Sequence, residues 1–294
     1  MTYTKPDPLH DPQTLPRMPG WVSSGREQTI EDVAFLSGGA LATLHMVLGR
    51  GDVPQALFRE RLALRAAEAC VGFSGRMERA GELRDALHLL RPGDQPGPAG
   101  DVYLQWRRTV ERPLSIKALH RALSAQAPNQ ITTWLDPGQG APVVRASAVL
   151  EAVLLDRPRA EATALILADA AMAQALGWDH IVPLLAAGLK PRDLRKGGDD
   201  LRMACHRAVV SAAAEAVRIA ADLTRRAVRL RAVSPKLRAK GADAAVEMFL
   251  RWDAVAPVAL PLPDRAARRL CDRLVELGAV RELTGRATFR LYGL

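Results

Sequence analysis

Histidine and cysteine side chains are the first candidates for chemistry in this chain, and their spacing argues against a catalytic or metal site. No two of the six histidines share a helical segment at a spacing of three or four residues, and neither HExxH nor a paired CxxC motif occurs. Cys205 and His206 are adjacent on an expected helix, so their side chains point in different directions. A Walker A loop, a GxSxG elbow and a GxGxxG motif after a strand are also missing. We therefore expect no metal, no cofactor and no catalytic residue, which makes enzymatic activity the least favoured class.

A carboxylate and an amide interrupt the apolar segment Glu161–Leu176. These are Asp169 and Gln174, and Trp178 follows the segment after Gly177. Because burying a carboxylate costs free energy unless a partner offsets its desolvation, we predict that Asp169 is buried and paired with a basic side chain. Asp169, Gln174 and Trp178 are thus a possible buried polar site, although a structural Asp–Arg pair is the favoured interpretation.

Positive charge is concentrated near the C-terminus. The formal net charge is +9, and residues 223–294 contribute +8 of it. The segment Leu223–Lys240 holds seven basic residues and no acidic one. Such clustering is typical of nucleic-acid binding, because neutralised phosphates release their counterions. Within this segment we expect phosphate contacts from Arg225, Arg229, Lys236, Arg238 and Lys240.

The last residues predict a helix followed by a hairpin. Pro263–Gly278 reads as one helix, with proline in the first turn and glycine at the C-terminal stop. Val280–Leu283 and Thr288–Tyr292 then flank a turn at Gly285. A helix followed by a hairpin is the second half of a winged helix. Its buried stripe would be Ala267, Leu270, Cys271, Leu274 and Leu277.

The opposite face of this helix carries the residues that we expect to contact DNA. The first turns of a recognition helix normally enter the major groove, which makes Arg268 and Arg269 the candidates for base edges. Arg286 lies at the hairpin turn and would reach a minor groove or a phosphate. The complete set on the helix and the turn is Arg265, Arg268, Arg269, Arg273 and Arg286.

The rest of the chain predicts a mainly α fold. Helix formers dominate and aromatic residues make up only 4% of the sequence. A long uninterrupted helix is expected over Leu201–Ala232, about 48 Å at 1.5 Å per residue. Shorter helices are expected before it, and Pro128 is one of the breaks between them. Seven of those earlier helices are expected, at Val33–Leu48, Pro54–Phe73, Gly81–Leu90, Gly100–Val110, Ser115–Ala125, Val143–Leu155 and Glu161–Leu176.

These elements suggest four regions. They are a polar tail (1–26), a helical domain (27–190), a loop with a long basic linking helix (191–240) and a winged-helix-like module (241–294). The odd number of cysteines indicates free buried thiols rather than a disulfide framework. No secretory signal and no run of about 18 apolar residues is evident, so we expect a cytoplasmic protein with no membrane segment.

The sequence resembles the bacterial family called domain of unknown function 1403 over nearly its full length. The resemblance rests on Leu15–Trp21 (LPRMPGW), Leu90–Gly100 (LRPGDQPGPAG), the segment from Leu167 to Trp178 and the C-terminal residues. It implies a bacterial, often plasmid-borne protein without an established activity. Residues 264–286 are also similar to the winged helix appended to Fic-type proteins, whose central His-Phe-Gly-Asn motif is absent here.

We therefore hypothesise a DNA-binding protein that uses a C-terminal winged helix and a basic linking helix on double-stranded DNA. The alternative is a non-catalytic adaptor or dimerisation protein whose winged helix docks on protein. A homodimer suits the first hypothesis, because winged-helix proteins often bind two half-sites.

Overall fold

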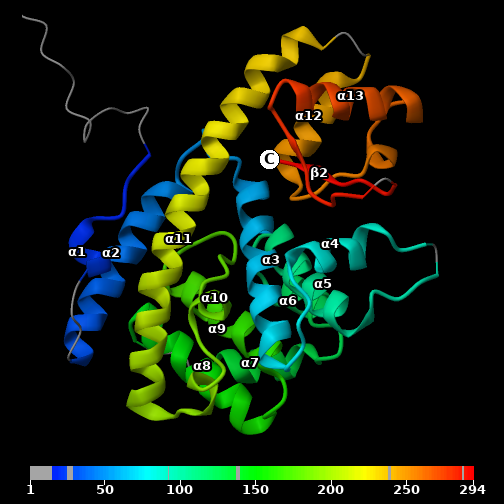
Figure 1. The fold of residues 1–294 in the computed structure, drawn as a ribbon. Coiled ribbons are helices and arrows are strands. Elements are labelled where there is room, and N and C mark those ends of the chain that lie inside the picture. Colours follow the sequence, from blue (N-terminus) through cyan, green and yellow to red (C-terminus); the bar gives the residue numbers. More distant parts are fainter. Residues whose placement is uncertain (1–14, 25–28, 92, 137–139, 238–239, 287) are drawn as a thin grey trace, which may run out of the picture.

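The structure is a computed structural model that describes residues 15–24, 29–91, 93–136, 140–237, 240–286 and 288–294. The fold is mainly helical, as predicted, with two short strands near the C-terminus (Figure 1). Its first α-helices are α1 (Gly20–Ser24), α2 (Ile30–Leu48), α3 (Gln55–Phe73), α4 (Ala80–His88), α5 (Gly97–Glu111), α6 (Ile116–Ala122) and α7 (Pro128–Leu135). The later ones are α8 (Pro142–Asp156), α9 (Glu161–Ala175), α10 (Leu185–Gly188), α11 (Gly198–Val233), α12 (Ala242–Arg251) and α13 (Asp264–Glu276). Three 3₁₀ turns and two strands accompany them, namely η1 (Asp193–Arg195), η2 (Ser234–Lys236), η3 (Pro257–Ala259), β1 (Arg281–Glu282) and β2 (Tyr292–Gly293).

The seven helices predicted before Gly177 are all present, as α2 to α6, α8 and α9. Helices α1, α7 and α10 are additional. Our interpretation of Pro128 as a break was incomplete, because this residue begins α7. Proline suits the first turn of a helix, where its missing N–H would have had no partner.

The core of the N-terminal part is built around α9, which is buried on every side from Thr163 to Ala173. A helix that is apolar all round can be stable only when it is surrounded by other helices. Helix α8 runs against α9, α3 packs against α5, and α2, α8 and α10 all contact α11. Cys70, Cys205 and Cys271 are buried free thiols, as predicted.

Helix α11 is the predicted long helix and runs along the whole molecule (Figure 1). Its 36 residues correspond to about 54 Å. It ends where η2 begins, because Pro235 has no N–H to continue the helical hydrogen bonds.

The C-terminal segment lies beside the last turns of α11 (Figure 1). The predicted helix at 264–277 is present as α13 and is packed through Leu270 and Leu274. The antiparallel pair is also present but is shorter than predicted: β1 pairs with β2, with Glu282 opposite Tyr292. Thr288 and Phe289 lie outside it, because Phe289 has a φ of 56°, which no extended strand adopts. An isolated bridge joins Val255 to Tyr292 on its other side.

The hydrophobic core continues across the predicted boundary before residue 241. Leu230 of α11, Phe249 of α12 and Leu274 of α13 belong to the same buried cluster as the N-terminal helices. The division into four regions stays a prediction, since a shared core neither requires nor excludes independent folding.

By length and composition alone, α2 could cross a membrane. However, 44% of its apolar stretch is buried inside the protein, and core helices of soluble proteins pass the same test. The absence of a membrane segment therefore stays a prediction.

Candidate nucleic-acid interface

Helix α13 presents a basic face, as predicted. Arg268 forms an ion pair of 3.0 Å with Asp264, and Arg273 forms one of 2.9 Å with Glu276. Arg265 and Arg269 are exposed, and the described part of the chain gives neither of them an ion pair. These two lie one helical turn apart on the same side. The uncompensated charge of α13 is thus a pair of arginines rather than the whole set of four.

The end of α11 adds arginines beside the C-terminus of α13. Arg225 and Arg226 share one carboxylate, that of Asp222, at 3.1 and 2.7 Å. The Nη2 atom of Arg229 donates a hydrogen bond of 3.2 Å to the carbonyl oxygen of Leu277. Lys236 and Lys240 are exposed, whereas Arg238 lies outside the described residues.

Arg281 is a member of this surface that sequence reasoning missed. Burial lowers the pKa of its guanidinium, and repulsion from Arg226, Arg61 and Arg84 lowers it further. An arginine guanidinium is not deprotonated in proteins, so the side chain stays charged although it is close to other positive groups. In the sequence the residue sits at the start of a short strand, which gives no sign of these neighbours.

Arg286, which we expected at the hairpin turn, has a partner within the protein. Its guanidinium forms an ion pair of 2.6 Å with Asp85 of α4. The hairpin is thereby held against the helical part of the protein. An arginine engaged in this way would have to leave Asp85 before it could reach a minor groove.

A buried ionic network joins the C-terminal segment to α3 and α4. The carboxylate of Asp253, only 1% exposed, accepts hydrogen bonds from Arg61 and from Arg84, the latter at 2.6 Å. Arg61 also donates to the carbonyl oxygen of Leu294 at 2.9 Å. Burial alone would raise the pKa of Asp253, but the two arginines outweigh it and hold this pKa below its ordinary value. The network therefore fixes how the C-terminal segment sits on the helices.

A second carboxylate extends this network. Glu60 accepts the backbone N–H of Asp253 at 2.8 Å and the guanidinium of Arg107 at 2.7 Å. Burial raises the pKa of Glu60, and Arg107 counteracts that increase. The guanidinium of Arg107 also lies 4.8 Å from the ring of Trp252, and that of Arg251 lies 4.9 Å from it.

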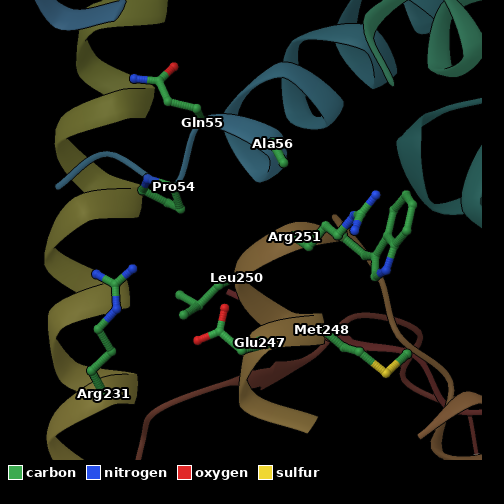
Figure 2. A pocket seen from close by; sticks show the side chains of 9 residues that line it. Pro54, Gln55, Ala56, Arg231, Glu247, Met248, Leu250 and Arg251 are labelled. Atoms are coloured by element: carbon green, nitrogen blue, oxygen red, sulfur yellow. The ribbon is translucent and has the colours of Figure 1, made fainter. Parts of the chain in front are cut away.

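A groove of about 510 Å³ lies where the start of α3 faces α11 and α12. Figure 2 shows Arg231 reaching toward it from α11 and Glu247 from α12, with Pro54 at the start of α3. Two arginines, Arg231 and Arg251, and one glutamate, Glu247, line this groove, so its positive charge is partly offset. The groove lies next to the basic end of α11, so it borders the candidate interface but is not part of the positive surface of that interface.

The possible buried polar site does not form. Asp169 is buried, as predicted, but the prediction of a basic partner was wrong: its oxygens accept the backbone N–H groups of Leu184 and Leu185 at 3.1 and 3.2 Å. These N–H groups at the start of α10 only partly offset the burial, which raises the pKa of Asp169. Gln174 is exposed. The Nε1 atom of Trp178 donates to Nδ1 of His45 at 2.9 Å instead.

Among the described side chains, no group of three or more His, Cys, Asp or Glu is placed to hold a metal ion. The geometry thus defines a mainly α protein whose C-terminal helix and paired strands lie beside the basic end of a long helix. The family model described as "Protein of unknown function (DUF1403)" matches residues 6–294, so the chain belongs to this family. No curated protein matches the chain.

Proposed function

We propose that this protein binds double-stranded DNA through α13 and the end of α11. The observation that carries the proposal is the contact of Arg229 with Leu277, which joins the basic end of α11 to the C-terminal end of α13. Arg265 and Arg269 on α13 have no ion pair within the described residues, and Arg225 and Arg226 share a single carboxylate. A duplex would supply the missing negative charge and release counterions.

The order of the C-terminal elements supports the same proposal. A helix (α12), an extended residue (Val255), a turn (η3), a second helix (α13) and two strands follow one another. Tyr292 pairs with Glu282 on one side and with Val255 on the other. This is the order in which a winged helix places its helices and strands, with η3 in the position of the short middle helix. The helix that follows the middle one, here α13, is the one that reads the major groove in such a module.

The salt dependence of duplex binding tests the proposal. Affinity of the full chain for a random-sequence duplex, followed by fluorescence anisotropy, should fall steeply as salt rises. The log–log slope should be near −0.9 for each phosphate neutralised. Arg229→Ala should weaken binding to all sequences alike, whereas Arg121→Ala should not. Arg121 is an exposed arginine on α6, away from α13, so it controls for the loss of one positive charge.

One observation favours the adaptor alternative. A groove of about 610 Å³ lies between the end of α4 and the C-terminal segment. Val258 and Phe289, which help to line it, are 83% and 71% exposed. Arg268 lines the same groove, so under this alternative its side chain would contact a protein partner. If the folded protein fails to bind duplex DNA even at low salt, this alternative becomes the better function.

A further inference from the structure

The outward face of α2 is apolar along nearly its whole length. Between Asp32 and Arg50 the chain holds no Asp, Glu, Lys or Arg, although this helix has one side on the surface. Phe35 is 70% exposed and Met46 is 55% exposed. The ring of Trp21 from α1, itself 50% exposed, stacks on Phe35 with ring centroids 5.3 Å apart. A surface helix normally carries charged or polar residues on its outer face, so this one departs from the rule.

Gly38 marks the centre of this face. A side chain added there would meet nothing within 4 Å, and the residue lies in the middle of a helix, where glycine is less stable than alanine. Its neighbour Gly39 has a reason within the chain, because a Cβ there would come within 2.8 Å of Trp21. No contact inside the described structure explains Gly38. A second backbone that approaches closely from outside would explain it.

The face is also complementary to itself. If two copies of α2 run antiparallel and cross between Gly38 and Ala42, Phe35 of one copy falls opposite His45 and Met46 of the other. Aromatic rings and methionine sulfur attract each other, and small residues at the crossing let the helices approach. The same alignment sets the acidic first turn at Glu31 near Arg50 of the other copy, although Arg50 already forms an ion pair of 3.0 Å with Asp52 of its own chain, so the apolar and small residues carry the match.

We therefore propose that two copies of this chain associate through α2, antiparallel, about a twofold axis near Gly38 and Ala42. A twofold interface uses the same patch on both subunits, which requires the self-complementarity that this helix has. The proposal is independent of the DNA-binding function, because α2 carries none of the residues assigned to that surface.

The size of the face predicts a weak dimer. Aromatic side chains bury about 150–250 Å² each, so the exposed parts of Trp21 and Phe35 amount to roughly 100 Å² each or slightly more. With Met46 and the small residues, each copy offers a few hundred Å², less than the roughly 800 Å² per partner of a standard stable interface. We expect dissociation in the micromolar range.

Sedimentation velocity over a concentration series tests the proposal. The full chain should shift from monomer toward dimer between about 1 and 200 µM. Gly38→Glu should weaken the association at least tenfold, because it places a charge at the crossing point. Gly72→Glu is the matched control: Gly72 lies in the last turn of α3, is exposed and has equally open space around it. Circular dichroism should show both variants folded.

Cysteine cross-linking then tests the antiparallel alignment. The three native cysteines are buried, so new surface cysteines should react first. When Gly38→Cys and Ala42→Cys chains are mixed and oxidised, the mixed disulfide should form faster than either homodisulfide. A chain that stays monomeric at 200 µM overturns the proposal, as does one whose dimer tolerates Gly38→Glu. Binding to phosphatidylcholine vesicles that is lost in Gly38→Glu, with no dimer in solution, would assign the face to a membrane and also overturn it.

Discussion

Arg229 donates a hydrogen bond of 3.2 Å to the carbonyl oxygen of Leu277, and this contact joins the end of the long helix to the end of α13. The next residue, Gly278, has a φ of 60°. A Cβ at this position would lie 2.6 Å from Nη2 of Arg229. Two features therefore require glycine at position 278: the left-handed backbone and the close approach of the Arg229 side chain.

Gly278→Ala should destabilise the protein through both effects. We expect the left-handed backbone alone to cost about 1–2 kcal/mol, with a smaller addition when Arg229 is displaced. Gly285→Ala is the matched control, since Gly285 has a φ of 59° and nothing within 4 Å of an added Cβ. Urea unfolding of the two variants should show the larger loss for Gly278→Ala. Equal losses would mean that the contact with Arg229 contributes nothing to stability.

Asp253→Ala should be strongly destabilising, because it leaves Arg61 and Arg84 near the protein interior without their shared carboxylate. Removing one partner of a buried ion pair costs about 3–5 kcal/mol. Asp222→Ala is the control: that carboxylate also holds two arginines, but on the surface, where an ion pair contributes about 0–1 kcal/mol. The free energy of unfolding from urea titrations measures both. Similar values for the two variants would contradict a structural role of the buried network.

Asp169 should make stability fall as pH rises. Burial raises the pKa of its carboxyl from 3.8 to about 8, although two backbone N–H groups act to lower it. The folded protein therefore binds more protons than the unfolded chain between these two values, so the free energy of unfolding decreases from about pH 4 to pH 8 and then levels off. The slope is on the order of 1 kcal/mol per pH unit.

Asp169→Asn should remove this component of the slope. The amide cannot accept both N–H groups, so the variant should also be less stable at pH 5. Glu60 contributes a slope of the same sign, because its pKa is raised as well. The contribution of Asp169 is therefore the difference in slope between the native chain and the Asp169→Asn variant. Urea unfolding at pH 5 and pH 8 gives the difference. Parallel pH profiles for the native chain and the variant would show that the carboxyl titrates alike in the folded and unfolded states.

The helices could be predicted from the sequence because their apolar residues recur at the helical spacing. Helix α7 was missed because Pro128 was interpreted as a break, and α10, with four residues, is too short to show a period. The burial of Asp169 followed from its apolar neighbours within α9. Its partners did not, because the N–H groups that bind it come from Leu184 and Leu185 at the start of α10.

The surroundings of the candidate site were the least predictable part. Asp253 lies 192 residues after Arg61 in the chain, and nothing near either residue indicates that they meet. The ion pair of Arg286 with Asp85 was missed for the same reason, since it exists only once the hairpin rests on α4. Local sequence could identify the basic residues of α13, but it could not tell which of them have partners.

That distinction gives a test within one helix. Arg265→Ala with Arg269→Ala removes two arginines that have no ion pair within the described structure. Arg268→Ala with Arg273→Ala removes two that are neutralised by Asp264 and Glu276. Both double variants lower the net charge by the same amount, so any long-range electrostatic effect on DNA binding should be equal.

If α13 enters the major groove, the first double variant should lose about 1–3 kcal/mol of binding free energy for each base contact, and its preference among duplex sequences should relax. Each phosphate contact that is lost should also reduce the steepness of the salt dependence by about 0.9. The second variant should bind nearly as the native chain does, because Arg268 and Arg273 would first have to leave their carboxylates. Anisotropy titrations at several salt concentrations measure both quantities, with circular dichroism to establish folding. Equal losses in the two variants would show that only net charge matters, and no loss in either would place the DNA-binding surface away from α13.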